Sequence, residues 1–363
     1  MQTGLENVDE LPRMRAVQIH QTGILNNENE HLKLNSIPIP AVRNDEVLIR
    51  VHYCGVCHTE IDEIENRTPP ATLPMTPGHQ VVGTVIRSGP DCRRKLSGAR
   101  VGVAWIFSAC DHCTFCQSGR ENLCADFRAC GRDRPGGYAE YMAVPENFVY
   151  PIPTRIAARQ AAPLLCAGAV GYRALRMTAI QNSEWLGLTG FGASGQLVLK
   201  MALALFPDTP VCVFARSPKE RQKALECGAT WAGETAQPPP RKLQAIIDTT
   251  PAWTPVLSAL ECLLPGGRLI VNAIRKEAGD QSVLLQLDYS RHLWMEKSIQ
   301  SVANVTREDV TEMLSLAARI ELESDVIEYP LERAEEALLA IKSGDIEAAS
   351  VLKVSPIDDT WNT

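Results

Sequence analysis

The sequence predicts an α/β protein with two parts, a doubly wound parallel sheet and a second domain rich in β-strands. In the middle of the chain, short apolar runs alternate with Ala-rich helical stretches. Alternation at this spacing implies parallel strands joined by right-handed crossovers. In the first part, β-branched runs are separated by irregular, Pro-rich stretches such as Thr68-Pro69-Pro70, which indicates β-structure with long loops.

The individual elements follow from these patterns. In the β-rich part, strands are expected at residues 47–51, 81–86 and 100–105. In the parallel sheet, strands are expected at residues 186–189, 211–214, 245–248 and 268–271, with helices at residues 195–205, 218–227 and 254–263. A last strand is expected at residues 350–354. The change of texture along the chain predicts domains at residues 1–160 and 161–300, followed by a C-terminal segment at residues 301–363.

The charge balance excludes some partners. Acidic residues outnumber basic ones by 43 to 36, and the pI is near 5.6. Nucleic acid and anionic membranes both require a basic surface, so neither is expected as the main partner. No apolar stretch approaches the roughly 18 residues of a membrane span, and residues 1–10 do not resemble a secretory signal. We therefore expect a cytoplasmic protein, whose twelve cysteines serve metal binding or catalysis rather than disulfides.

A glycine-rich turn predicts a dinucleotide site. Residues 190–195 form a G-x-G-x-x-G motif between an apolar strand and a helix. Gly190 permits the tight turn, Gly192 lets the backbone approach a pyrophosphate, and Gly195 lets the helix pack closely on the strand. Ala193 and Ser194 lie in the first turn of that helix, whose N-terminus attracts the anion. This context predicts a Rossmann-type cofactor site, with a purely structural turn as the alternative.

The end of the second parallel strand bears on the choice of cofactor. It reads Phe214-Ala215-Arg216-Ser217, without the acidic residue that normally binds the adenine ribose hydroxyls. Arg216 and Ser217 can instead bind a 2′-phosphate, which favours NADP over NAD. The alternative is that Arg216 is a solvated surface charge and that NAD binds without the acid.

Four cysteines have the spacing of a metal cluster. Cys110, Cys113, Cys116 and Cys124 follow the pattern C-x2-C-x2-C-x7-C. Four thiolates fill the tetrahedron around Zn²⁺ and leave no position for a substrate, so this pattern predicts a structural zinc. An iron–sulfur cluster is an alternative, although nothing else in the chain indicates electron transfer. Unrelated free cysteines are the other alternative.

The remaining candidate ligands are scattered. Cys54 and Cys57 precede His79, and Cys166 lies much later in an apolar stretch. Taken alone, Cys166 has the character of a small core residue. Cys54 and Cys57 have the spacing of a redox pair, but no thioredoxin-like unit surrounds them.

The order of six motifs resembles the zinc-dependent alcohol dehydrogenases of the medium-chain dehydrogenase/reductase superfamily, across residues 14–354. The motifs are G-V-C-H-T-E from Gly55, P-G-H from Pro77, the four-cysteine run, G-G-Y-A-E-Y from Gly136, L-L-C-A-G from Leu164 and G-F-G-A-S-G from Gly190. The resemblance implies a GroES-like catalytic domain, completed by residues 301–363. It also implies one catalytic and one structural zinc per subunit, and a homodimer or homotetramer.

The resemblance also assigns roles to single residues. It implies that Cys57, His79 and Cys166 hold the catalytic zinc and leave a fourth position for water or a substrate oxygen. Glu60 matches the acid that orients the His ligand, and Cys54 has no role in the family pattern.

The resemblance implies a reversible hydride transfer from an alcohol to a nicotinamide cofactor, which converts the alcohol to an aldehyde or ketone. Thr59 matches the residue through which the proton leaves, and His58 matches the position that meets the cofactor pyrophosphate. Trp105 is expected to line the substrate pocket, with ordinary core packing as the alternative.

The sequence departs from the family pattern at three positions. Asp62 stands where many relatives have the His that ends the proton relay, so Asp62 or solvent is expected to end it. Gln80 replaces the usual Glu after the His ligand, and Val170 replaces a Thr near the nicotinamide. Two other functions stay open: a polyol or aromatic-alcohol dehydrogenase, and a non-catalytic dinucleotide-binding sensor or scaffold of the same fold.

Overall fold

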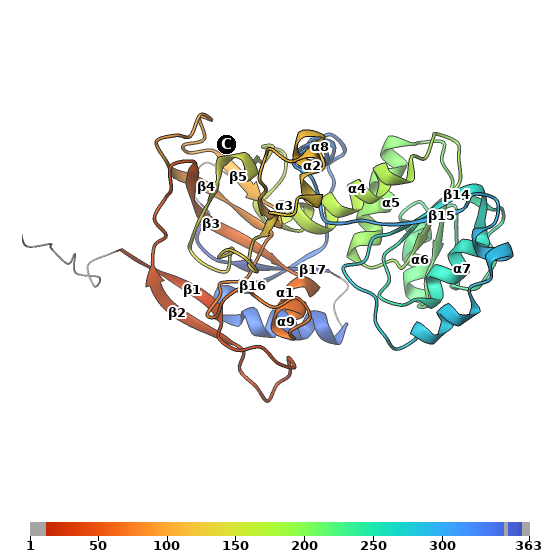
Figure 1. The fold of residues 1–363 in the computed structure, drawn as a ribbon, viewed down its shortest axis with the longest axis horizontal. Coiled ribbons are helices and arrows are strands. Elements are labelled where there is room, and N and C mark those ends of the chain that lie inside the picture. Colours follow the sequence, from red (N-terminus) through yellow and green to blue (C-terminus); the bar gives the residue numbers. More distant parts are fainter. Residues whose placement is uncertain (1–11, 345–347, 358–363) are drawn as a thin grey trace, which may run out of the picture. The chain divides into compact units, whose positions relative to one another are not determined.

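The computed structural model describes residues 12–344 and 348–357 (Figure 1). The chain forms two compact units. Among the described residues, the first combines residues 12–166 with residues 325–344 and 348–357, and the second is Ala167–Ser324. These boundaries differ from the expected ones at residues 160 and 300, because residues 161–166 stay with the first unit and residues 301–324 stay with the second.

The first unit is rich in β-structure. Its strands are β1 (Arg13–Ile19), β2 (Leu32–Pro38), β3 (Glu46–Val56), β4 (Val81–Ser88), β5 (Arg100–Val103), β6 (Ile106–Ser108), β7 (Arg128–Ala129), β8 (Tyr141–Pro145), β9 (Tyr150–Pro151), β16 (Val326–Pro330) and β17 (Ala349–Lys353). The main sheet has the order β16-β17-β3-β4-β5-β9, and β8 also pairs with β3. The helices of this unit are α1 (His58–Ile64), α2 (Thr114–Gln117), α3 (Ala158–Pro163) and α9 (Ala334–Ser343).

Strand β3 is the centre of this sheet. It pairs with β4, β8 and β17, and all its residues except Arg50 are buried. A near-continuous apolar run is typical of a strand covered on both faces. Since β3 ends at Val56 and α1 begins at His58, the sheet fixes the position of Cys57 between them.

The second unit is a parallel sheet with helices. Its strands are β10 (Leu186–Thr189), β11 (Val211–Phe214), β12 (Trp231–Gly233), β13 (Leu243–Asp248), β14 (Leu263–Val271) and β15 (Ser298–Ser301). Its helices are α4 (Ala169–Thr178), α5 (Ala193–Leu205), α6 (Pro218–Glu226), α7 (Thr254–Cys262) and α8 (Arg307–Ile320). The strand order is β12-β11-β10-β13-β14-β15, with every pair parallel. The predicted fold class is confirmed.

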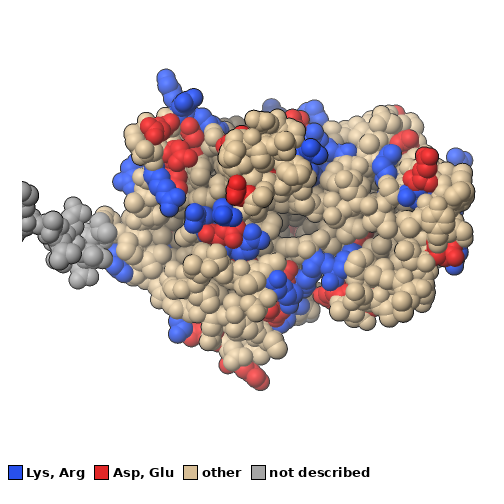
Figure 2. Space-filling model, in the orientation of Figure 1, with Lys and Arg blue, Asp and Glu red and all other residues tan. Residues whose placement is uncertain are grey.

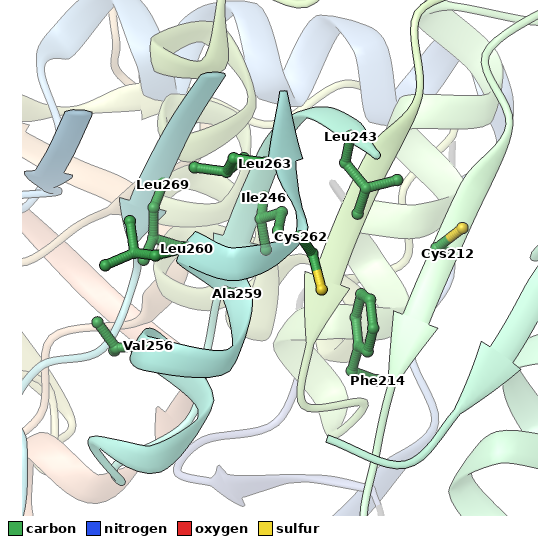
Figure 3. Close-up of a cluster of buried hydrophobic side chains, with 10 residues drawn as sticks. All are labelled: Cys212, Phe214, Leu243, Ile246, Val256, Ala259, Leu260, Cys262, Leu263 and Leu269. Carbon is green, nitrogen blue, oxygen red and sulfur yellow. The ribbon is translucent and has the colours of Figure 1, made fainter. Parts of the chain in front are cut away.

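This strand order reverses between β10 and β13, and a doubly wound sheet binds its ligand at the carboxyl ends of the strands beside that point. The core behind it is apolar. Figure 3 shows side chains of α7, such as Leu260, together with side chains of the strands, such as Phe214 and Ile246.

Helix α8 explains the shifted boundary. Thr306 and Asp309 form a capping box at its N-terminus. The buried carboxylate of Asp309 accepts a hydrogen bond from Arg173 of α4 at 2.7 Å, and Arg176 contacts Glu312 at 3.0 Å. These ion pairs join α8 to α4, so residues 301–324 belong to the second unit.

No helix in the described ranges is long and apolar enough to cross a membrane. On the face drawn in Figure 2, basic and acidic side chains lie interspersed. Basic and acidic side chains also form pairs, as Arg67 does with Glu65 at 2.5 Å. This mixed distribution agrees with the modest net negative charge of the sequence.

Candidate functional site

Cys57 caps helix α1. Its Sγ accepts a hydrogen bond from the backbone N–H of Thr59 at 3.4 Å, and its own N–H donates to Glu60 Oε2 at 2.9 Å. The two contacts form a capping box, with Cys in the place usually taken by Ser or Thr. The helix start therefore fixes both the sulfur of Cys57 and the carboxylate of Glu60.

His79 precedes strand β4 and faces the same point. Its Nδ1 lies 2.6 Å from Glu60 Oε1, and its Nε2 lies 3.6 Å from Cys57 Sγ. Both His79 and Glu60 are buried. Because Glu60 accepts the Nδ1 proton, Nε2 is left as the ring nitrogen for a metal.

Cys166 completes the group from a distant part of the sequence. It lies in the π-helical segment Leu164–Gly168. The ligand atoms of Cys57, His79 and Cys166 all lie within 4.8 Å of one another. A tetrahedral zinc with bonds of about 2.3 Å to sulfur and about 2.05 Å to nitrogen has an S···N edge of about 3.6 Å. The 3.6 Å between Cys57 and His79 equals that edge, and three ligands leave one position open.

The protonation of these side chains responds to their neighbours. A hydrogen bond with Cys166, together with burial, raises the pKa of the Cys57 thiol. Burial alone would lower the pKa of His79, but the nearby Glu60 carboxylate and Cys57 outweigh it and raise the pKa. A divalent cation favours the opposite forms, thiolate and neutral imidazole, so metal binding at this group releases protons.

The four predicted cluster cysteines also come together. Their sulfur atoms all lie within 4.8 Å of one another. Cys116 Sγ is 3.8 Å from Cys110 Sγ and 3.6 Å from Cys113 Sγ, close to the S···S edge of about 3.8 Å of a zinc tetrathiolate. Backbone N–H groups of His112 and Cys113 lower the pKa of Cys110 to about 6. This geometry fits a closed metal site.

Cys54 lies outside both groups. It is fully buried within β3, and its Sγ packs against Gly78 and Gly137. Cys54 and Cys57 are free thiols. The structure thus separates two cysteines that their spacing alone could not distinguish.

Thr59 and Trp105 adjoin the Cys57–His79 pair. The Cys57 thiol donates to Thr59 Oγ1 at 3.3 Å. The ring of Trp105 lies edge-on to that of His79, with centroids 6.5 Å apart, and Phe127 lies 5.5 Å from Trp105. The Arg132 guanidinium lies 5.3 Å above the Trp105 ring. An aromatic surface therefore adjoins the candidate metal ligands.

The other site residues predicted in this unit have varied surroundings. His58 opens α1 and is exposed. Asp62 is buried, and its Oδ1 accepts hydrogen bonds from Arg67, with Nη2 at 2.6 Å. Gln80 is buried and packs on Gly55, and its amide nitrogen has no hydrogen-bond partner among the described residues. The role of Asp62 in a proton relay stays a prediction.

Sequence reasoning missed Glu63. The carboxyl is buried in α1, and neither oxygen has a hydrogen-bond partner in the described part of the chain. Burial and the neighbouring Glu60 charge raise the pKa of Glu63 well above its usual range. No sequence signal indicated this, because acidic residues on a short helix are ordinarily expected to face solvent.

In the second unit, the glycine motif forms the turn between β10 and α5. Gly190 has φ of +82°, which favours glycine. A Cβ on Gly195 would lie 2.7 Å from the carbonyl oxygen of Gly190, so only glycine allows this packing. A Cβ on Gly192 would meet no described atom within 4 Å, which leaves space beside the turn. Ala193 and Ser194 begin α5, whose N-terminus has no side-chain cap. Its amides are therefore available to a phosphate.

Arg216 and Ser217 follow β11, and Arg216 is exposed. Arg221, which sequence reasoning missed, donates from Nη1 to the carbonyl oxygens of Ala215 at 2.9 Å and Arg216 at 2.8 Å. It thereby fixes the backbone of the turn that carries Arg216. The only feature of the sequence that indicated this role was the position of Arg221, one helical turn after the start of α6.

The sequence is similar to known alcohol dehydrogenases over most of its length. Residues 43–154 match the family model of the alcohol dehydrogenase GroES-like domain. A probable alcohol dehydrogenase of Mycobacterium tuberculosis is 36% identical over 346 residues, covering 94% of this chain and 97% of the relative. Cinnamyl alcohol dehydrogenase 1 of Capsicum annuum is 34% identical over 244 residues, covering 63% of this chain and 68% of the relative.

Among solved structures, the cobalt- and zinc-bound thermostable alcohol dehydrogenase from Pyrobaculum aerophilum has the same fold. Its TM-score is 0.82 at 23% sequence identity, covering 94% of this chain and 100% of that chain.

Proposed function

Because the chain belongs to the zinc-dependent alcohol dehydrogenases of the medium-chain dehydrogenase/reductase superfamily, we propose that Cys57, His79 and Cys166 form its catalytic metal site. The observation that carries the proposal is the convergence of three ligand atoms with a fourth tetrahedral position left open. The cluster of four cysteines, which has no open position, is the structural zinc site. The reaction is reversible hydride transfer between an alcohol and a nicotinamide dinucleotide.

The surrounding residues perform the proton chemistry and the positioning. A zinc ion at this site supplies Lewis acidity toward the substrate oxygen. A bound nicotinamide would accept the hydride from the alcohol carbon, and Thr59 Oγ1 would take the hydroxyl proton on its way out of the site. Glu60 holds the His79 ring in the orientation that presents Nε2. Asp62 or solvent takes the proton at the end of the relay.

The substrates we propose are aromatic alcohols and aldehydes. Trp105 and Phe127 form an aromatic surface beside His79. A ring on the substrate can stack on such a surface, whereas a polyol would place hydroxyl groups against it without hydrogen-bond partners. The relative from Capsicum annuum, which by its name acts on cinnamyl alcohol, supports the same substrate class.

We also propose NADP(H) as the preferred cofactor, a cytoplasmic location and a homodimer or homotetramer. The cofactor preference rests on Arg216 and Ser217 at the end of β11, where no acidic residue stands to repel a 2′-phosphate. The location and the oligomer follow from the resemblance to the family.

The experiment is a panel of aromatic, aliphatic and polyol substrates with both cofactors, run on wild type, Cys57→Ser and Cys54→Ser. Wild type should reduce aromatic aldehydes fastest, Cys57→Ser should lose turnover, and Cys54→Ser should keep it. Undiminished turnover in Cys57→Ser contradicts the metal assignment. A wild-type chain that binds NADPH but turns over no substrate on the panel favours the non-catalytic alternative.

A further inference from the structure

A buried ion pair lies at the carboxyl ends of the parallel strands, outside the machinery described so far. Asp248 is the last residue of β13 and is fully buried. Lys276, from the loop after β14, forms an ion pair with its carboxylate, and its side chain is 9% exposed. Burying two charges carries a desolvation cost that the pair offsets only when further hydrogen bonds satisfy both members.

Both members have those hydrogen bonds. Asp248 accepts from the hydroxyl of Thr189 at 2.5 Å and from the hydroxyl of Thr250 at 2.8 Å. The Lys276 ammonium donates to the carbonyl oxygens of Thr250 at 2.8 Å and Ala252 at 2.9 Å, in addition to Asp248. All three protons of the ammonium are therefore used.

The ion pair is one of several contacts between two backbone segments, the loop after β14 and the turn between β13 and α7. The N–H of Glu277 donates to the carbonyl oxygen of Pro251 at 2.7 Å. The Asp280 carboxylate accepts from the N–H groups of Trp253 at 3.0 Å and Thr254 at 2.7 Å. Hydrogen bonds from the loop after β14 thus fix the turn between β13 and α7 from one end of the turn to the other.

That turn lies against the first glycine of the G-x-G-x-x-G motif. A Cβ on Gly190 would lie 2.7 Å from Thr249 Oγ1 and 3.0 Å from Thr250 Cγ2. Thr249 also donates from Oγ1 to the carbonyl oxygen of Thr189 at 2.9 Å. Thr249 is thus hydrogen-bonded to Thr189, the residue before Gly190, and the space beside Gly190 is too small for a side chain. A shift of the Thr249–Thr250 backbone therefore displaces the glycine turn.

We propose that Asp248 and Lys276 are positioning residues for the dinucleotide. Their ion pair fixes the turn after β13 against Gly190 and so keeps the glycine turn in its binding shape. The inference rests on the proposed function, because it takes the glycine turn as the cofactor site. Since the ion pair acts through Gly190, its loss weakens cofactor binding and leaves the hydride-transfer step itself in place.

The test measures the Kd of NADPH and NADH by fluorescence titration, and KM and kcat in the same variants. Lys276→Met should raise the cofactor Kd and KM on the order of ten-fold, equivalent to about 1.4 kcal/mol, and change kcat little. Lys276→Arg, which keeps the charge and the donors, should recover part of the affinity. Asp248→Asn combined with Lys276→Met should cost less than the sum of the single changes, because the two residues share one interaction.

Lys297→Met is the matched control. Lys297 Nζ also donates to two backbone carbonyls, those of Leu260 at 2.8 Å and Arg291 at 2.9 Å, but at the other end of α7. Its removal should lower thermal stability and leave cofactor Kd unchanged.

Two outcomes overturn the inference. One is a Lys276→Met variant with the wild-type Kd, and the other is a Lys297→Met variant that weakens cofactor binding as much, which would indicate general destabilisation. A wild-type chain that binds neither dinucleotide is a different result, because it removes the proposed function on which the inference rests.

Discussion

Glu60→Gln perturbs the support of the metal site by exchanging one atom of a fully buried side chain. The carboxylate accepts two hydrogen bonds, from His79 Nδ1 at 2.6 Å and from the N–H of Cys57 at 2.9 Å. A glutamine has only one acceptor oxygen, so its NH2 group must face one of these two donors. One hydrogen bond is lost, and the glutamine NH2 group then faces another N–H donor in the buried interior.

The magnitude follows from the lost contact. A hydrogen bond to a charged group contributes roughly 1.5–3 kcal/mol, and loss of such a partner of a metal-bound His lowers metal affinity about 10- to 100-fold. Glu60→Gln should therefore weaken zinc binding at the Cys57–His79–Cys166 group by that factor. The cluster of four cysteines does not involve Glu60, so its zinc should be retained.

The assay is competition with a chromogenic chelator, which resolves the weaker site from the tighter one, combined with kcat/KM after dialysis. Glu63→Gln is the control, since Glu63 lies on the same helix and is equally buried, but neither of its oxygens has a hydrogen-bond partner in the described ranges. The reasoning is refuted if Glu60→Gln holds its second zinc as tightly as wild type, or if Glu63→Gln loses as much affinity.

Three further predictions concern other parts of the chain. Gly195→Ala places a Cβ 2.7 Å from the carbonyl oxygen of Gly190, so cofactor affinity should fall at least ten-fold, by about 1.4 kcal/mol; an unchanged Kd by titration contradicts the packing role. Arg216→Ala removes a charge-assisted contact to a 2′-phosphate, so the KM for NADPH should rise much more than that for NADH, and equal changes would remove the basis for NADP preference. Burial raises the pKa of Glu63 in the folded protein, so the Glu63 carboxyl loses its proton at a lower pH in the unfolded chain than in the folded one. The free energy of unfolding therefore falls as pH rises above about 4.5. Urea unfolding should show Glu63→Gln gaining stability relative to wild type between about pH 5 and pH 8, and parallel pH curves for the two proteins would show that Glu63 ionises normally.

Local patterns allowed much of the fold to be predicted. The apolar runs at β10, β11 and β13 and the glycine turn before α5 each carry their signal within a few residues. The spacing of the four cluster cysteines is likewise local, since two-residue gaps bring sulfurs to one ion. Such features depend little on the rest of the chain.

Features that depend on distant parts of the chain were beyond sequence reasoning. Spacing could not separate Cys57 from Cys54; the end of β3 does so, because Cys54 is fully buried in the strand whereas Cys57 follows the strand as the half-buried cap of α1. The second unit extends to Ser324 rather than to the expected residue 300, because ion pairs to α4 hold α8. The pairing of Asp248 with Lys276 joins the end of β13 to a loop 28 residues later in the chain.

The most direct test of the central claim is the zinc content of the purified chain and of Cys57→Ala, measured by mass spectrometry with Cys54→Ala as the control. We expect two zinc ions per chain in wild type and Cys54→Ala, and one in Cys57→Ala. Two zinc ions in Cys57→Ala, or one in Cys54→Ala, would contradict the assignment of Cys57, His79 and Cys166 as the catalytic metal site.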